Sequence, residues 1–283
     1  MPRSTDKDPD IDRNRQGAKI VGILGLPRSG TTVVTAVLDV NSSVYSVYEP
    51  WNANMGRIDF ESPMNYGQFS SLFLSSMPSS ATVVLKETAT RIDYINRMVE
   101  VISTAPVQNR EILLIIRNPF HVFLSEMQAR RQWWGEADLA INADSFSKWA
   151  RRTLHALSVM AKVVRRYDGL LLSYEAFTSE PSRGVEDVTR ALGLEPESAQ
   201  FAFEKYLDKT RVRGDNHVAL APESLGDRST IRRETEFKEL RAELQKSDLF
   251  ERIELFAERH RAIPMLSRGR DQAQFIESML NAN

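Results

Sequence analysis

The stretch GLPRSGTT, residues 25–32, constrains the fold of this chain more than any other feature. It lies between an apolar, β-branched run at residues 19–24 and a helical pattern at residues 31–40. A glycine-containing loop between a buried strand and a helix directs backbone N–H groups at one point, with the positive end of the helix dipole behind them. The stretch therefore predicts a strand, a tight loop and a helix that together bind an anion.

The loop is close to a P-loop, whose pattern is G-x-x-x-x-G-K-[ST]. Gly25, Gly30 and Thr32 fall in register with that pattern, but Thr31 stands where the lysine belongs. That lysine reaches the β- and γ-phosphates of a nucleoside triphosphate. Arg28 brings a cation inside the loop instead, and its planar fork suits two oxygens of one anion. We therefore expect a smaller phosphate-like group, handled without a metal ion.

The rest of the chain alternates between two kinds of pattern. Continuous apolar runs of this length are typical of strands buried on both faces of a parallel sheet, and helical patterns between them favour a doubly wound α/β fold. The later chain is mainly helical, and core packing explains the apolar stripe of its last long helical stretch, residues 234–261. Further strands are expected at residues 82–85, 111–116 and 169–172, and further helices at residues 91–103, 120–131, 145–166, 182–192 and 196–207.

Composition limits the function classes. The 283 residues suffice for one large α/β domain, and the net charge of −1 gives no overall attraction to nucleic acid. There is no cysteine, which excludes disulfides and thiol catalysis, and the four histidines show no metal-ligand spacing. Residues 1–17 are polar and predict a disordered tail, and no apolar run reaches the roughly 20 residues of a membrane span. We expect a cytoplasmic protein with one domain, residues 18–283, in which helices flank a parallel P-loop-like sheet and the C-terminal part is helical.

A second pattern, RNPFHVFLS, begins where the strand at residues 111–116 ends. Arg117 stands where a magnesium-dependent NTPase would place an acidic residue. Ser125 lies two helical turns further along, and Pro119 fits the first turn of the helix between them. A strand-end arginine and a hydroxyl at this spacing can converge on one anion.

Together the two patterns resemble the sulfotransferases that use 3′-phosphoadenosine 5′-phosphosulfate (PAPS). RNPFHVFLS resembles the family motif for the 3′-phosphate, which implies that Arg117 and Ser125 hold this group and that the cofactor product is 3′-phosphoadenosine 5′-phosphate (PAP). GLPRSGTT resembles the family loop for the 5′-phosphosulfate, in which Arg28 would also stabilise the charge that develops during transfer. The 5′-phosphosulfate site implied by the resemblance consists of Arg28, Ser29, Gly30, Thr31 and Thr32.

The resemblance extends along the chain with lower specificity. LLLSYEAFTSEP resembles a family segment after a later strand, which implies that Tyr174 and Glu175 fix a junction between strand and helix. RGDN, residues 213–216, resembles a glycine loop that closes over the nucleotide, so Arg213 and Gly214 are expected to bind the cofactor. A plain surface loop explains RGDN equally well.

An alcohol acceptor needs a base to remove its proton. The stretch YEP, residues 48–50, resembles a segment of the Golgi carbohydrate sulfotransferases and their bacterial relatives, which implies Glu49 as the general base. Lys86 resembles a family cation near the acceptor that would neutralise charge, although a strand-end salt bridge explains it equally well. Glu87 and His121 are alternative bases.

The sequence thus predicts transfer of a sulfuryl group from PAPS to a hydroxyl of a small molecule, glycan or glycolipid, with no nucleic-acid partner, no integral membrane segment and no metal. A P-loop kinase or NTPase with a displaced lysine is one alternative, but it lacks the strand-end aspartate and leaves Ser125 without a role. A non-catalytic module that senses PAP through the same pockets is the other.

Overall fold

The computed structural model of the protein describes residues 18–51, 78, 80–89, 91–105, 107–132, 134–197, 227–269, 274 and 276–278. For residues 227–233 it describes the backbone alone. Three predictions therefore lie outside the described residues: the tail at residues 1–17, the helix at residues 196–207 beyond residue 197, and the loop with Arg213 and Gly214.

The described strands form one sheet in the order β2-β3-β1-β4-β5-β6. β1 pairs in parallel with β3 on one side and β4 on the other, β2 and β5 extend the sheet in parallel, and β6 pairs with β5 in the antiparallel direction. This arrangement confirms the predicted α/β fold with a mainly parallel sheet. The strands are β1 (Lys19–Gly25), β2 (Val44–Tyr48), β3 (Thr82–Thr88), β4 (Asn109–Ile116), β5 (Leu170–Ser173) and β6 (Leu266–Arg268).

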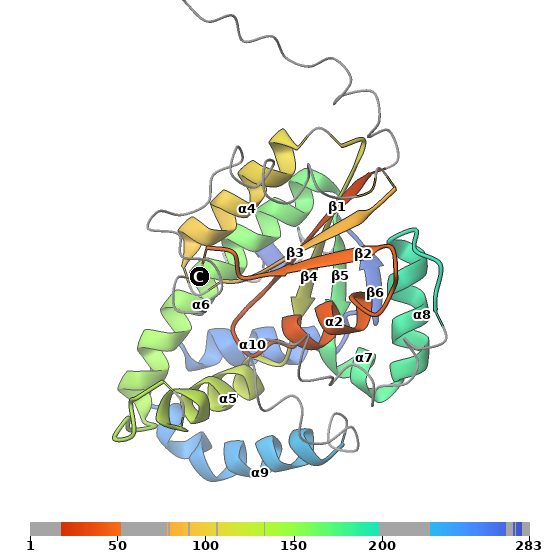
Figure 1. Ribbon diagram of the computed structural model, residues 1–283. Coiled ribbons are helices and arrows are strands. Elements are labelled where there is room, and N and C mark those ends of the chain that lie inside the picture. The colour runs from red at the N-terminus through yellow and green to blue at the C-terminus, as the bar shows by residue number, and fades with distance from the viewer. Residues whose placement is uncertain are drawn as a thin grey trace, which may run out of the picture.

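Helices cover both faces of the sheet (Figure 1). Alternate side chains of a strand point to opposite faces, so β1 gives Ile20 and Leu24 to one apolar cluster and Val21 and Ile23 to the other. The first cluster includes side chains of α4, α5, α6, α9 and α10, and the second includes those of α2, α7 and α8. The helices are α2 (Thr31–Leu38), α4 (Ile92–Thr104), α5 (Pro119–Gln132), α6 (Ala143–Tyr167), α7 (Tyr174–Ser179), α8 (Pro181–Ala191), α9 (Asp227–Leu244) and α10 (Phe250–His260).

Each of the four strands predicted from the sequence is present, but β2 and β6 were not predicted. β2 has the sequence VYSVY and borders only β3, so some of its side chains are exposed and its apolar signal is weak. β6 has three residues, and its pairing with β5 places it in the sheet. Local sequence gives no signal for a strand that depends on a partner so distant in the chain.

The long helical stretch predicted at residues 234–261 is wrong in one respect, because the structure divides it into α9 and α10. The N–H of Ser247 donates to the carbonyl of Leu244, and the Ser247 hydroxyl accepts from the N–H of Leu249. These turn bonds replace the helical ones, since serine side chains compete for backbone groups. After the break, both α9 and α10 contact α5.

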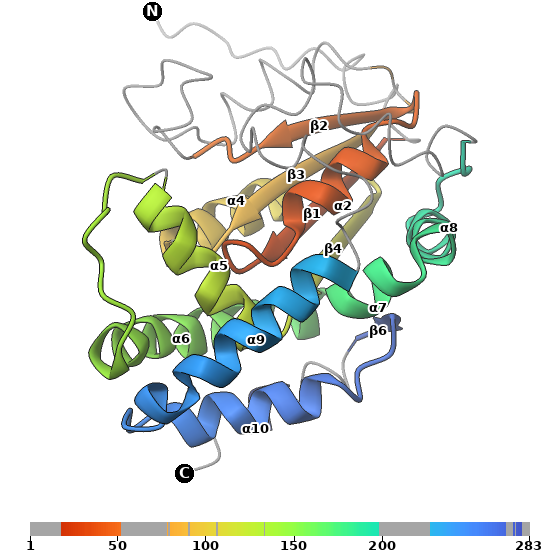
Figure 2. The same cartoon turned by 90° about the horizontal axis from the view of Figure 1, so that it is seen from below.

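The apolar stripe of these two helices packs in the core, as predicted. The Phe237 ring of α9 lies 4.1 Å from the ring of Phe120 at the start of α5. Ile253 and Phe256 of α10 are buried in the same cluster. Figure 2 shows α9 and α10 beside α5, so the C-terminal helices hold the helix that carries Ser125.

The carboxyl ends of β1 and β4 lie side by side at the point where the chain changes direction across the sheet. β1 continues into α2 on one face, whereas β4 continues into α5 on the other. Open parallel sheets bind ligands in the crevice at such a switch point. The GLPRSGTT loop and Arg117 both lie at this edge, so the fold brings the two sequence motifs together.

Candidate anion-binding site

The loop between β1 and α2 has the backbone of an anion site. Arg28 has a φ of 69° and Gly30 a φ of 97°, so both residues are in the left-handed region. Gly30 is the N-cap of α2, where no side chain makes a cap hydrogen bond and no acidic residue occupies the first turn. The first N–H groups of the helix can therefore bind an anion, with the helix dipole behind them.

Tyr174 explains why residue 30 has to be glycine. A Cβ atom on Gly30 would lie 2.1 Å from the Tyr174 ring, closer than any packed structure allows. Tyr174 begins α7, and the guanidinium of Arg117 lies over its ring, 4.7 Å from the centroid. The aromatic ring thus packs against the loop and also supports the strand-end arginine.

The side chains of the two sequence motifs meet at the carboxyl edge of the sheet. Nη1 of Arg117 donates to the carbonyl oxygen of Arg28 at 2.9 Å, and Nε of Arg28 donates to Oγ of Ser125 at 3.3 Å. Ser125 is buried, and the hydroxyl of Ser29 is fully buried with no hydrogen-bond partner within the part of the chain that the structure describes. The side chains of Arg28, Arg117 and Ser125 are therefore linked beside the N-terminus of α2.

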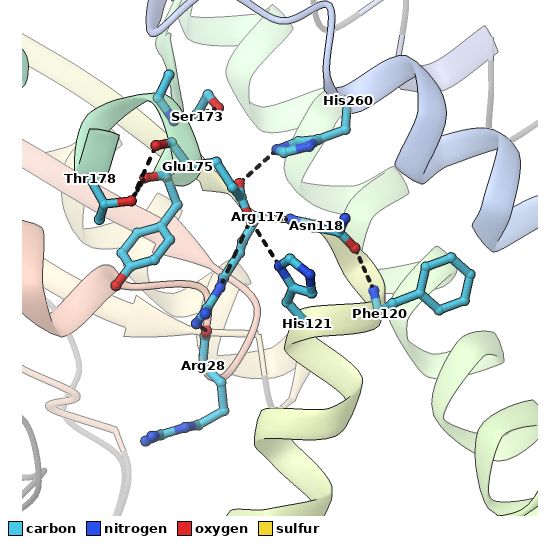
Figure 3. Close-up of polar contacts among 11 residues, drawn as sticks. Arg28, Arg117, Asn118, Phe120, His121, Ser173, Glu175, Thr178 and His260 are labelled. Carbon is cyan, nitrogen blue, oxygen red and sulfur yellow. Dashed lines mark hydrogen bonds and ion pairs between the residues drawn. The ribbon is translucent and has the colours of Figure 1, made fainter. Parts of the chain in front are cut away.

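Behind Arg117 lies the partly buried carboxylate of Glu175, which contacts three other elements (Figure 3). Oε1 of Glu175 accepts the backbone N–H of Asn118 at 3.0 Å and lies 4.0 Å from Nε of Arg117. Nδ1 of His121 lies 3.6 Å from the same oxygen, and Nε2 of His260 lies 3.2 Å from Oε2. The carboxylate thus joins the start of α5, the end of α10 and the strand-end arginine.

The surroundings of Glu175 favour its charged form. Burial alone would raise its pKa, but the contacts with His121 and His260 and the N–H of Asn118 outweigh burial and hold the pKa well below its usual range. A carboxylate with these donors stays ionised at neutral pH. It therefore faces Arg117 as a permanent negative charge.

The resemblance of YEAF to a family segment pointed to Glu175, but His260 gave no signal in the sequence. His260 lies at the end of α10, in a part of the chain that matched no motif. Its side chain is buried, and only the packing of α10 brings it to Glu175. His121 is also buried and turned toward Glu175, so it is not presented to an acceptor in this structure.

Glu49 and Lys86, the predicted base and cation, are in contact. Nζ of Lys86 forms an ion pair with Oε1 of Glu49, and the backbone N–H of Glu49 donates to the carbonyl of Lys86 at 2.8 Å. Glu49 has a φ of 46°, in the left-handed region that costs a non-glycine residue free energy. The side chain of Glu49 is 11% exposed and that of Lys86 3%. The salt bridge expected as the alternative for Lys86 is present, and its partner is the candidate base.

Glu87, the alternative base next to Lys86, lies in a different environment. It is fully buried, and its Oε1 accepts the N–H of Thr88 at 2.9 Å. Burial, followed by the nearby charge of Glu49, raises the pKa of Glu87 to about 8. A buried neutral acid cannot meet an acceptor hydroxyl, so Glu49 is the better placed of the two carboxyl groups.

The described residues contain no group of three or more His, Cys, Asp and Glu side chains placed to hold a metal ion. Among the helices in the described ranges, none combines the length and apolar character that crossing a membrane requires.

No family model and no curated protein matches the chain. Among solved structures, the sulfotransferase domain of the Synechococcus olefin synthase covers 96% of this chain and 97% of its own at 12% identity, with a TM-score of 0.47. Mouse SULT7A1, complexed with PAP, covers 85% and 89% at 13% identity, with a TM-score of 0.48. Sulfotransferase STF9 of Mycobacterium avium covers 83% and 79% at 14% identity, with a TM-score of 0.46.

These three proteins are sulfotransferases, the class that the two sequence motifs resemble. At identities of 12–14% and TM-scores below 0.5, the likeness itself carries no argument about activity. Function is therefore inferred from the side chains at the carboxyl edge of the sheet.

Proposed function

We propose that this protein transfers the sulfuryl group of PAPS to a hydroxyl group of a small molecule, glycan or glycolipid. The observation that carries the proposal is the meeting of Arg28, Arg117 and Ser125 beside the uncapped N-terminus of α2. Arginine forks and hydroxyls bind phosphate oxygens well, and a helix N-terminus binds a second anionic group. PAPS carries two such groups, at its 3′ and 5′ positions.

The cofactor would be held by the two motifs in separate roles. The loop N–H groups, with Arg28, Ser29, Gly30, Thr31 and Thr32, would hold the 5′-phosphosulfate. The uncapped N-terminus of α2 supports this role, because no side chain caps its first N–H groups.

The 3′-phosphate would lie against Arg117 and Ser125. Both side chains make hydrogen bonds that involve Arg28, which supports a shared role in binding one phosphate group. Arg213 and Gly214 stay a proposal for closure over the nucleotide, on the sequence resemblance alone.

The transfer needs a base, a cation and an aligned acceptor. When bound, PAPS supplies the sulfuryl group, and PAP departs with the electron pair of the broken S–O bond. Glu49 would take the proton of the acceptor hydroxyl while the acceptor oxygen forms the new bond to sulfur. Lys86, already paired with Glu49, would hold that carboxylate in place and offset the charge on the sulfonate oxygens. Arg28 would stabilise the charge that builds up on the bridging oxygen.

The P-loop kinase is disfavoured by the same residues. A magnesium-dependent enzyme needs an ionised acidic side chain at the end of a neighbouring strand. Arg117 directly follows β4, and β3 ends one residue after Glu87, which is fully buried and has a pKa raised to about 8. A carboxyl group that is mostly protonated at pH 7 is a poor magnesium ligand.

A thermal-shift titration tests the proposal, because a ligand that binds only the folded state raises the melting temperature. PAP in EDTA is compared with ATP plus magnesium. We expect PAP to raise the melting temperature without metal, after which radiolabelled PAPS is used to screen hydroxyl acceptors. A shift with ATP and magnesium alone would identify a kinase-like protein. Binding of PAP with no transfer to any acceptor class would favour a PAP-sensing module.

A further inference from the structure

Glu87 is a fully buried carboxyl group that has no role in the proposed transfer. It lies beside the candidate base, because the turn of residues 49–51 crosses the carboxyl end of β3. On one side of β3, Lys86 holds Glu49 through its carbonyl oxygen and its ammonium group. On the other side, Trp51 is buried in the apolar cluster that Glu87 faces.

Both ends of the turn are thus fixed by consecutive residues of one strand. Side chains of neighbouring strand residues point to opposite faces, so Lys86 and Glu87 contact the turn from opposite sides. The backbone N–H groups of Thr88 and Trp51 act on the Glu87 carboxyl as donors. The strained φ of Glu49, 46°, needs such support from its surroundings.

We propose that Glu87 works as a neutral carboxylic acid that positions Glu49, because a neutral group adds no second negative charge beside Glu49 and leaves the Lys86 ammonium to Glu49 alone. The inference rests on the proposed function only in taking Glu49 as the base. Burial and the charge of Glu49, opposed by the N–H of Thr88, the ammonium of Lys86 and the N–H of Trp51, raise the pKa of Glu87 to about 8.

Ionisation of Glu87 would weaken this arrangement. A second negative charge would then lie near Glu49, and through space it would also attract the Lys86 ammonium that Glu49 binds. The pair that presents Glu49 to an acceptor would loosen above pH 8. Positioning of the base should therefore be lost on the alkaline side.

The pH dependence of stability tests the neutral acid without any activity measurement. A folded-state pKa raised from its reference value of 4.5 to about 8 means that the folded chain keeps a proton that the unfolded chain has lost. Stability from this group is complete below the unfolded pKa and declines as pH rises toward 8. We compare the folding equilibrium constant of the wild type with that of Glu87→Gln as a ratio. Between the unfolded pKa of 4.5 and the folded pKa of about 8, this ratio should fall about tenfold per pH unit.

Urea unfolding of the wild type, Glu87→Gln and the exposed control Glu100→Gln between pH 5 and pH 8 measures this ratio. Only Glu87→Gln should remove the decline, because glutamine mimics the neutral acid at every pH. In Glu49→Gln the decline should end at a lower pH, since the charge that helps to raise the pKa of Glu87 is gone. Parallel stability curves for the wild type and Glu87→Gln would overturn the neutral acid.

Infrared spectroscopy of the wild type gives a second readout that needs no variant. At pH 7 ordinary carboxyl groups are ionised, so a protonated carboxyl band that disappears as pH rises through 8 is expected. Absence of that band would also refute the neutral acid.

The positioning role is tested with an acceptor from the PAPS screen. We expect the kcat of the wild type to fall above pH 8 while the KM for PAPS stays constant, and we expect Glu87→Gln to keep its kcat. An alkaline loss that persists in Glu87→Gln would leave Glu87 buried and neutral but without the positioning role. Failure of PAP to bind would overturn the proposed function instead, and the stability ratio would be unaffected by it.

Discussion

Replacement of Arg117 by alanine separates the two anion sites, because only one of them should depend on this side chain. In PAP the guanidinium would face the 3′-phosphate, whereas adenosine 5′-monophosphate has no phosphate there. A hydrogen bond to a charged group contributes about 1.5–3 kcal/mol, which is a factor of about 10 to 150 in affinity. We expect Arg117→Ala to weaken PAP binding by this factor for the 3′-phosphate contact, multiplied by any loss through the 5′ loop.

The loss for adenosine 5′-monophosphate should be smaller and has a separate origin. Arg117 also donates to the carbonyl of Arg28, and that bond helps to hold the 5′ loop. That bond has a charged donor and contributes at most about 1.5–3 kcal/mol to the loop, and only the part that orders the loop for binding appears in the affinity. The ratio of the two losses therefore reports the 3′-phosphate contact alone.

Isothermal titration calorimetry of both ligands measures the ratio, with Arg183→Ala as the matched control. Arg183 is exposed on α8 and pairs with Glu180, so its loss should change neither affinity. Equal losses for the two ligands in Arg117→Ala would show that Arg117 serves the loop and not the 3′-phosphate. An unchanged PAP affinity would remove Arg117 from the cofactor site altogether.

Two further predictions concern the carboxylates at this edge of the sheet. Glu49→Gln should keep the PAP affinity of the wild type and lower turnover by about 10² to 10⁴, the usual contribution of a general base, and full turnover would exclude Glu49. The pKa of Glu175 is depressed, so its stabilising contribution is complete above the unfolded value of about 4.3 and is lost as pH falls below it. Urea unfolding should show Glu175→Gln less stable than the wild type at pH 7, with the difference shrinking in acid. A difference that is constant with pH would mean that Glu175 is not ionised in the fold.

The parts of the fold that the sequence predicted are those that depend on neighbours in the chain. β1 is continuously apolar because both faces of the sheet bury it, and the glycine loop follows it directly. Arg117 and Ser125 were recognisable because a strand end and one helix fix their spacing. Their meeting with Arg28 follows from the parallel pairing of β1 and β4, which puts both carboxyl ends at one edge.

The parts that were not predicted depend on contacts between distant segments. His260 reaches Glu175 only because α9 and α10 separate and pack on α5, and no spacing rule joins these residues. β6 is likewise defined by its pairing with β5. A buried histidine at a helix end has no sequence signal until the element opposite it is known.

Lys86 and Glu87 are adjacent, and the sequence offered both as candidate site residues, but burial gives them different roles. In the sequence they form a charged pair at a strand end, and either one could have served the site. The alternation of the strand turns Lys86 toward Glu49, with which it forms an ion pair. It turns Glu87 toward the apolar cluster, where burial favours the neutral acid. The chemistry open to each residue is therefore decided by the face of the sheet on which its side chain lies, which the strand register fixes and the residue type does not.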